Sequence, residues 1–302
     1  MGFIYIDNEN TDYYISFLTF TSNYRKIGVD QNTGEDQYEE YANSINSFKN
    51  YLTFPSSKKV RDASFKSNEQ IIYISFHFGP YKLLVNHLIS KGIDVALLIG
   101  KEFYTEESEF INELHKKEST SKNRGDLVLL DISDRKSFIQ LKRLISKGYS
   151  VFSFIDNYEV KDENTQKSNY DNVTFFNTEL SIKNGIIRIS KLFNIKIALL
   201  LCYMDNDTIN ITLHEFSSTP KMQDVFDVFG KSLSKYPYQW EPWLYCNNWF
   251  VEQPKNVSLE TLKSTEYELL KTDNGYFIYH YDNLLFYEID AKSFENKLQK
   301  HT

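Results

Sequence analysis

Cysteine is nearly missing from this chain, which has only Cys202 and Cys246 among its 302 residues and no CxxC spacing. With so few cysteines, no disulfide framework is implied. Because Cys202 stands in the apolar run Ile197–Tyr203, we expect a buried and inert thiol there. None of the six histidines pairs with another histidine or with a cysteine at ligand spacing, so the sequence predicts no metal site.

Long apolar runs and an excess of positive charge are missing as well. No run approaches the roughly 18 residues that a membrane-spanning helix needs, and the first residues lack the basic and apolar regions of a signal peptide. We therefore expect a soluble, cytoplasmic protein. The net charge of −7 argues against nucleic acid as a partner and against broad electrostatic adhesion to anionic lipid. Local basic patches and peripheral membrane contact stay open.

Several short motifs that indicate a function are absent too. The chain has no phosphate-binding P-loop, no GxGxxG after a strand, no GxSxG nucleophile elbow and no HExxH. Nucleotide binding, serine hydrolysis and zinc-dependent hydrolysis are therefore left without motif support.

What the chain does have is a regular alternation of strand and helix patterns, with 41% apolar residues to build a core. We expect strands at 71–76, 95–99, 127–130, 150–155, 173–176, 196–203 and 209–216, and helices at 81–91, 105–117, 136–147, 179–193 and 221–234. This alternation predicts an α/β fold, in which a central mostly parallel or mixed sheet is flanked by helices on both faces.

The two ends of the chain have different patterns. Residues 35–52 predict an amphipathic helix, and Tyr13–Phe20 fits either a strand or a short helix. After Pro254 comes a helix-like segment, and then turn signals at Asn274-Gly275 and Asp282-Asn283 separate aromatic runs. Such turns predict a small β-rich appendage at the C-terminus.

Expectations for single side chains follow from the helix patterns. In the helix at 136–147, Phe138, Leu141, Leu144 and Ile145 are expected to face inward, with Ser133 or Asp134 as the N-terminal cap. On the helix at 81–91, His87 is expected at the surface.

His77 is the strongest candidate for a catalytic residue. The strand expected at Ile71–Phe76 stops at His77, and Gly79 and Pro80 then turn the chain into a helix. A histidine at the carboxyl end of a strand is in the usual place for a catalytic base in an α/β protein. The alternative is a turn histidine that only satisfies backbone groups, and the local pattern leaves both interpretations open.

Five segments carry a resemblance to a known family. They are His77-Phe-Gly-Pro-Tyr-Lys82, Asp134-Arg135 with Lys147-Gly148-Tyr-Ser-Val, Ile155-Asp156-Asn157, Val173-Thr-Phe-Phe-Asn177 and Tyr236-Pro-Tyr-Gln-Trp240-Glu-Pro-Trp243. In order and spacing, over about residues 70–250, they resemble the lipid A (lauroyl/myristoyl) acyltransferases of the lysophospholipid acyltransferase superfamily.

The resemblance implies a reaction and a set of roles. His77 would be the general base that takes the proton of an acceptor hydroxyl as it attacks an acyl thioester. Gly79 and Arg135 would contact substrate, with Arg135 clamping an anionic group. Phe175 and Phe176 would line the pocket. The thioester of coenzyme A or of an acyl carrier protein would be the donor substrate, and no cofactor is implied.

Lys82 departs from the family pattern, which has a carboxylate at this position to support the histidine. An ammonium there disfavours an imidazolium. Three explanations stay open: another carboxylate such as Asp156 or Glu102 reaches His77, Lys82 itself binds a substrate carboxylate or phosphate, or the protein has left acyl transfer and kept the pocket. Asp156 would otherwise orient the acceptor or support the histidine from behind.

We therefore expect an acyltransferase-like enzyme that acts on a hydroxyl or amine of a soluble small-molecule or peptide natural product. The alternatives are a non-catalytic binding or scaffold protein that keeps this fold, and amide formation in the same pocket. The expected domains are an acyltransferase-like domain at 1–254 and an appendage at 255–302, which either recognises a partner or covers a sheet edge.

Overall fold

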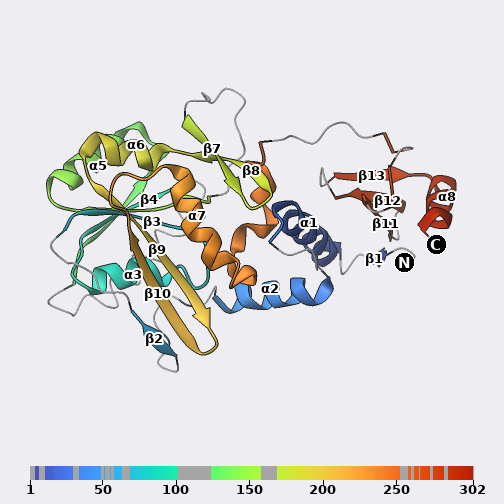
Figure 1. Ribbon diagram of the computed structural model, residues 1–302, viewed down its shortest axis with the longest axis horizontal. Helices are drawn as coiled ribbons and strands as arrows, with labels where there is room; N and C mark the ends of the chain where they lie inside the picture. Colours follow the sequence, from blue (N-terminus) through green and yellow to red (C-terminus); the bar gives the residue numbers. More distant parts are fainter. Residues whose placement is uncertain are drawn as a thin grey trace. The chain divides into compact units, whose positions relative to one another are not determined.

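The structure is a computed structural model (Figure 1). It describes residues 4–6, 11–29, 34–48, 51, 55, 58–62, 69–100, 124–157, 169–251, 258–259, 262–264, 266–272, 275–281 and 285–301. The chain divides into two compact units. The terminal unit comprises Met1–Glu40, Thr174–Ser181 and Pro242–Thr302, and the large unit comprises Tyr41–Val173 and Ile182–Glu241.

A mixed sheet of seven strands forms the centre of the large unit. Its order is β2 (Lys59–Arg61), β10 (Thr208–Glu215), β9 (Lys196–Asp205), β3 (Ile71–Ser75), β6 (Ser150–Phe154), β4 (Val95–Ile99) and β5 (Leu127–Asp131). From β9 to β5 all neighbours are parallel, whereas β10 runs antiparallel to β9 and β2 is parallel to β10. The α/β fold with a mostly parallel, mixed sheet is thereby confirmed.

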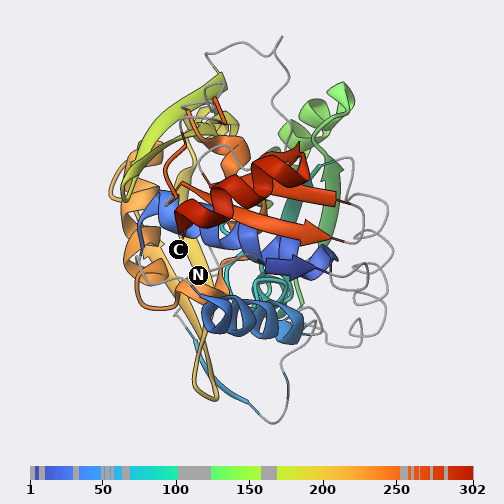
Figure 2. The same ribbon diagram turned by 90° about the vertical axis from the view of Figure 1, so that its right-hand side faces the viewer.

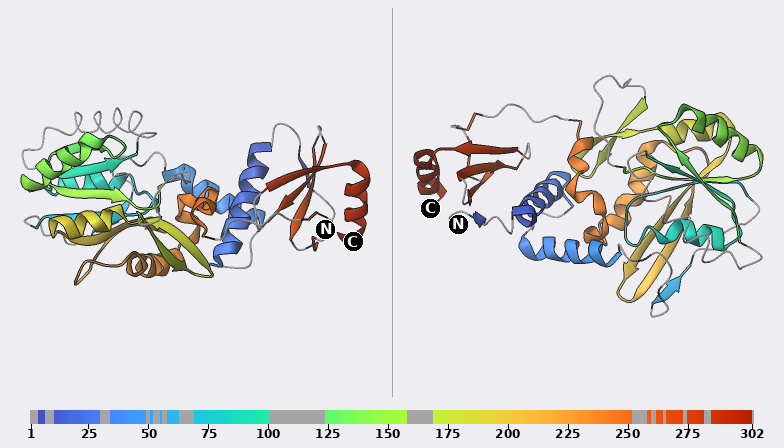
Figure 3. Two further views of the ribbon diagram at one scale, coloured as in Figure 1. Left: turned by 90° about the horizontal axis from the view of Figure 1, so that it is seen from above. Right: turned by 180° about the vertical axis from the view of Figure 1, so that it is seen from behind.

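Helices cover both faces of this sheet (Figures 1 and 3). Helix α3 (Leu83–Ser90) packs on one face, where Leu84 and Leu88 share a buried cluster with Tyr73 of β3. On the opposite face lie α5 (Arg135–Ser146), α6 (Gly185–Phe193) and α7 (Met222–Leu233). There Phe229 of α7 stacks on Phe76 at 3.7 Å between ring centroids. The helices lie on opposite faces of the sheet because the right-handed crossovers that contain them run in opposite directions along it.

Helix α5 shows how well the pattern predicted a helix and where it failed. The Asp134 side chain accepts a hydrogen bond from the Lys136 N–H at 2.9 Å, so Asp134 is the N-terminal cap. Leu141, Leu144 and Ile145 are buried as expected. The inward position of Phe138 was wrong, because 48% of this residue is exposed and its ring lies on the flank of α5, against the ring of Phe193 of α6.

The expected helix at 179–193 is wrong in its first third. Residues Thr178–Lys183 form β8, which pairs with β7 (Tyr170–Phe175), and the helix α6 begins only at Gly185. Leu180 and Ile182 are buried while their neighbours are not. This alternation with a period of two is typical of a strand that is buried on one face.

The expected surface position of His87 was also wrong. Only 4% of His87 is exposed, and its Nε2 lies 2.7 Å from Oδ1 of Asp62, whose Oδ2 in turn lies 2.6 Å from Lys91 Nζ. Burial lowers the pKa of His87, and the carboxylate of Asp62 opposes this shift. The pair ties the chain just after β2 to α3.

The terminal unit contains the β-rich part that was expected at the C-terminus. Its four-stranded sheet has the order β1 (Ile4–Ile6), β11 (Tyr267–Thr272), β12 (Gly275–His280) and β13 (Leu285–Ile289). Helix α8 (Ala291–His301) packs on it through Phe294, whose ring lies 4.8 Å from that of Tyr276 (Figure 2). The strand β1, parallel to β11, comes from the other end of the chain and was not expected.

Two further helices lie near the start of the chain. The segment around Tyr13–Phe20 is helical, within α1 (Thr11–Ile27), and α2 spans Glu35–Phe48, close to the helix expected at 35–52. Gly28, with φ +81°, follows the end of α1. Because compact units are defined by packing and not by independent folding, the domain boundary at residue 254 stays a prediction.

Some expectations lie outside the described residues. These are the helix at 105–117, Glu102, Asn274, Asp282, Asn283 and most of the segment just after Pro254. Among the helices that the structure does describe, none combines the length and the apolar character that crossing a bilayer requires.

Candidate active site

The edge at which β3 and β6 end brings two polar residues together. These strands are parallel neighbours, with Ser75 opposite Phe154 in register. His77 and Asp156 each follow the end of their strand by two residues, and the Ile155 N–H donates to the Ser75 carbonyl at 3.0 Å between them. Because the carboxyl ends of parallel strands meet at one edge of a sheet, the two side chains face each other there.

Asp156 is fully buried and holds His77 at two points. Its Oδ1 lies 2.8 Å from Nδ1 of the imidazole, and both carboxylate oxygens accept from the His77 backbone N–H, at 3.0 and 2.9 Å. Both the ring and the main chain of His77 are thus fixed by one carboxylate. Of the three explanations that the sequence left open for Lys82, the geometry provides the first, with Asp156 as the carboxylate that reaches the histidine.

A tryptophan supplies a further donor to the same carboxylate. Nε1 of Trp240, which is itself fully buried, donates to Asp156 Oδ2 at 2.9 Å. Each of these partners of the carboxylate is an N–H group. An ionised carboxylate only accepts hydrogen bonds, so this surrounding matches its charged form.

The same contacts define the tautomer of the imidazole. A carboxylate oxygen at 2.8 Å from Nδ1 requires that Nδ1 carries the proton and donates. In the neutral ring the lone pair then lies on Nε2, the nitrogen that serves as the base in acid–histidine pairs. The carboxylate also stabilises the imidazolium that forms when Nε2 takes up a proton.

The segment around Trp240 is attached to the turn after His77 by backbone pairing. The Gly79 N–H donates to the Gln239 carbonyl at 2.8 Å, and the Glu241 N–H donates to the His77 carbonyl at 2.9 Å. The Gln239 side-chain amide bonds both backbone groups of Met204 on β9, at 2.9 and 2.7 Å. Trp240 is thereby held in register with the turn that carries the imidazole.

Gly79 is required by the close approach of this turn to β9. Its φ is +60°, and a Cβ there would lie 2.4 Å from the carbonyl oxygen of Cys202 and 2.8 Å from Cα of Tyr203. Both contacts are with backbone, which cannot move aside as a flexible side chain can. Any other residue would push the turn, and His77 with it, away from the sheet.

Aromatic rings enclose the imidazole on two sides. The ring of Phe154 stacks on it at 4.4 Å between centroids, and Tyr81 meets it edge-on at 4.7 Å. The His77 side chain is 15% exposed, whereas Asp156 is completely covered. The histidine therefore reaches the surface while its carboxylate partner is shielded from water.

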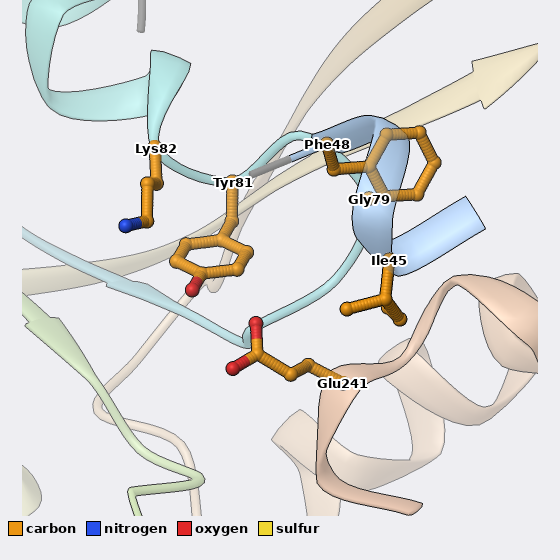
Figure 4. A pocket seen from close by; sticks show the side chains of 6 residues that line it. All are labelled: Ile45, Phe48, Gly79, Tyr81, Lys82 and Glu241. Carbon is orange, nitrogen blue, oxygen red and sulfur yellow. The ribbon is translucent and has the colours of Figure 1, made fainter. Parts of the chain in front are cut away.

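A small pocket that opens to solvent lies next to Tyr81 (Figure 4). Its lining residues are Ile45, Phe48, Gly79, Tyr81, Lys82 and Glu241. In Figure 4 the Lys82 ammonium and the Glu241 carboxylate lie toward different sides of the Tyr81 ring, and Ile45 and Phe48 of α2 form an apolar wall. Tyr81 contacts the imidazole and also lines the pocket, which presents a cation, an anion and an apolar surface.

Three further predicted site residues, Arg135, Phe175 and Phe176, do not figure in the contacts given above for His77 and Asp156. Arg135 is the first residue of α5, and its side chain lies outside what the structure describes. Phe175 is buried at the end of β7, and Phe176, with φ +50°, follows it at 4.8 Å between rings. Both phenylalanines belong to the terminal unit and His77 to the large unit, so their role in a pocket stays a prediction.

Three residues of the site had no role assigned from the sequence, namely Gln239, Trp240 and Glu241. Their signal was present as the run Tyr236–Trp243, in which two tryptophans and two prolines surround one glutamine. A role for Trp240 follows only from its indole N–H, which needs a partner when it is buried. That the partner is Asp156 depends on the fold.

Comparison with known proteins does not place this geometry in a family. No protein-family model matches the chain, and a search of curated proteins finds no match to it. Within the described residues, no three or more histidine, cysteine, aspartate or glutamate side chains gather as a metal site. What the site can do therefore follows from the buried Asp156, the imidazole of His77 and the pocket beside Tyr81.

Proposed function

We propose that this protein is an acyltransferase-like enzyme in which His77 is the general base. It moves an acyl group from the thioester of an acyl carrier protein or coenzyme A to a hydroxyl or amine of a soluble small-molecule or peptide natural product. The observation that carries the proposal is the 2.8 Å hydrogen bond between the His77 imidazole and the buried carboxylate of Asp156. The five motifs that resemble the lipid A acyltransferases support it.

The reaction follows from the tautomer of the imidazole. Nε2 takes the proton from the acceptor hydroxyl or amine while its oxygen or nitrogen forms a bond to the thioester carbonyl carbon. The tetrahedral intermediate then collapses and the carbon–sulfur bond breaks. The leaving thiolate receives the proton from the imidazolium, so that His77 ends neutral and the products are an acylated acceptor and a free thiol.

Asp156 provides the support that Lys82 cannot give. In the serine protease template, exchange of the orienting aspartate for asparagine lowers kcat by about 10⁴, because the imidazole takes the wrong tautomer. Asp156 lies at comparable hydrogen-bond distance and is better shielded from water than an exposed acid. With this carboxylate in place, the support of His77 does not depend on Lys82, and we propose that Lys82, which lines the pocket, attracts an anionic group of the substrate.

Arg135 and the two phenylalanines keep the roles that the resemblance implies. Arg135, at the start of α5, would hold an anionic substrate group, and Gly79 would contact the substrate. Phe175 and Phe176 would line the pocket. Each of these assignments rests on the motif alone.

The test is turnover with a panel of acyl-carrier and acyl-coenzyme A thioesters against hydroxyl and amine acceptors, with products identified by mass. We expect His77→Ala to lower turnover by about 10²–10⁴-fold, the range of general-base catalysis. His214→Ala is the matched control, because His214 is exposed on β10 and contacts Phe216. Turnover that survives His77→Ala would reject the assignment of the base.

The product distinguishes the remaining alternatives. An amide product would show that the acceptor is an amine, and an ester that it is a hydroxyl. The presence of Lys82 at the position of the family acid favours one other function, a binding or scaffold protein that has kept the fold. Absence of turnover with every donor, together with tight binding of a thioester, would favour that function.

A further inference from the structure

The outer surface of helices α5 and α6 has a charge opposite to that of the whole chain. Helix α5 carries Arg135, Lys136, Lys142 and Arg143 and no acidic residue, and α6 carries cations without any acid. The chain as a whole has a net charge of −7. Positive charge is therefore concentrated on two neighbouring helices of an acidic protein.

Large apolar side chains are exposed on the same two helices. Ile139 and Phe138 of α5 are 56% and 48% exposed, and Leu192 of α6 is 64% exposed. Single exposed apolar residues are ordinary on protein surfaces, but several on adjoining helices indicate a contact surface. We call Phe138, Ile139, Leu192, Lys136, Lys142 and Arg143 the α5–α6 patch.

The spacing along α5 mixes the two kinds of side chain on one face. Ile139 stands three residues after Lys136, three before Lys142 and four before Arg143, and residues three or four apart are neighbours on a helix. The opposite face of α5 holds the buried leucines of the core. Each of the three cations is exposed, and their aliphatic stems can lie along an apolar surface while the charged ends remain in a polar layer.

Helices α5 and α6 present this surface together. The rings of Phe138 and Phe193 lie 6.2 Å apart, and the two helices lie side by side in Figures 1 and 3. The acidic residues of the turn before α5 are engaged locally: Asp134 caps the helix, and Asp131 Oδ1 accepts from Ser133. They stand at one end of the patch and do not interrupt it.

We infer that the α5–α6 patch docks this protein on the surface of an anionic lipid bilayer. Anionic headgroups complement the lysines and arginine, and the interfacial region accepts exposed Phe, Ile and Leu side chains. Nucleic acid would use the cations but gains nothing from an exposed Ile139 or Leu192. The docking is peripheral and independent of the acyl transfer proposed above.

The experiment is sedimentation of the full chain with sucrose-loaded vesicles of 70% phosphatidylcholine and 30% phosphatidylglycerol, with pure phosphatidylcholine vesicles in parallel. We expect binding to the anionic vesicles only, and loss of binding in 0.5 M NaCl because salt screens the attraction. Lys142→Gln with Arg143→Gln should weaken binding roughly 30-fold, since each basic residue near an anionic surface contributes about a factor of five. Phe138→Ser with Ile139→Ser should weaken it about tenfold.

A matched control removes the same charge elsewhere. Lys231 and Lys235 are exposed lysines one turn apart on and just after α7, whose large apolar residues are buried. Lys231→Gln with Lys235→Gln should leave vesicle binding within twofold of the unaltered protein. All changed positions are exposed, and thermal unfolding checks that each variant is folded.

Several results would overturn the inference. They are absence of binding to the anionic vesicles, equal loss in the α7 control, or tighter patch-dependent binding to a single-stranded RNA than to vesicles. A dimer that only the patch variants dissociate, without vesicle binding, would assign the surface to a second copy of the chain.

Discussion

Exchange of Asp156 for asparagine tests the arrangement of the site most sharply. The amide has the shape of the carboxylate but replaces one acceptor oxygen with a donor NH2 group. One oxygen of Asp156 faces Trp240 Nε1 at 2.9 Å, and the other faces His77 Nδ1 at 2.8 Å. The His77 backbone N–H reaches both oxygens, so it can bond the amide oxygen in either orientation.

Trp240 decides which way the asparagine turns. An indole has a single tautomer and can only donate, so the amide oxygen must face Trp240 and the NH2 must face His77. The imidazole can adapt by moving its proton from Nδ1 to Nε2. It then accepts from the amide at Nδ1, and the nitrogen that served as the base is protonated.

We therefore expect Asp156→Asn to lower kcat/KM by about 10⁴, as in the protease template, with little change in KM. The loss of charge-assisted hydrogen bonds should also lower the free energy of unfolding by about 2–3 kcal/mol. The assay combines thioester turnover with ¹⁵N NMR of the His77 ring, which distinguishes the two tautomers. Asp227→Asn, on the exposed side of α7, removes the same charge and should leave both readouts unchanged.

A second change isolates the tautomer as the cause. In Asp156→Asn with Trp240→Phe the indole donor is gone, so the amide oxygen can face His77 again and restore the Nδ1–H tautomer. The double variant should recover part of the activity that the single variant lost. If the double variant is no more active than Asp156→Asn, or if Asp156→Asn stays within tenfold of the unaltered enzyme, the reasoning is refuted.

Three further changes test neighbouring parts of the account. Trp240→Phe alone should lower turnover about tenfold and lower the free energy of unfolding in urea by roughly 1–3 kcal/mol, because the buried carboxylate loses one hydrogen-bond donor. Unchanged turnover would show that Trp240 does not position Asp156. Gly79→Ala should lower the free energy of unfolding by more than Gly148→Ala does. Both glycines have a positive φ, but of the two only Gly79 would place its new Cβ 2.4 Å from a backbone atom. Equal losses in the same urea assay would contradict the close approach of the turn to β9. Burial lowers the pKa of His87 below its ordinary 6.5. The contribution of the neutral imidazole to the free energy of unfolding is therefore fully present above pH 6.5 and is lost as the pH falls through the lowered pKa. His87→Gln should weaken the pH dependence of the free energy of unfolding, measured in urea between pH 7 and 5. An unchanged pH dependence in this variant would contradict the role given to His87.

The sequence could predict the strands because buried parallel strands are continuous apolar runs. It placed His77 and Asp156 each at the end of such a run. It could not show that β3 and β6 are neighbours, since strand order depends on how the crossovers pack. For that reason Asp156 stayed one of two candidate partners of His77, and the meeting of the two residues is visible only in the fold.

The errors have local physical causes. The helix expected at 179–193 includes Glu179–Lys183 because the two-residue alternation there runs directly into the helical pattern that follows Gly185. Phe138 and His87 were misplaced because a helix pattern defines a core face but not what packs on its flanks. The ring of Phe138 lies on the flank of α5 beside Phe193 of α6, and Asp62, just after β2, supplies a hydrogen-bond partner for the buried His87.

The central claim is that the imidazole of His77, supported by Asp156, activates a nucleophile toward a thioester. Release of free thiol from acyl donors, with water in place of the acceptor, measures this without knowledge of the natural acceptor. The account predicts slow release with at least one acyl-carrier or coenzyme A thioester that falls at least about 10²-fold in His77→Ala and not in His214→Ala. Equal release by the unaltered protein and His77→Ala, or none with any donor, would contradict it.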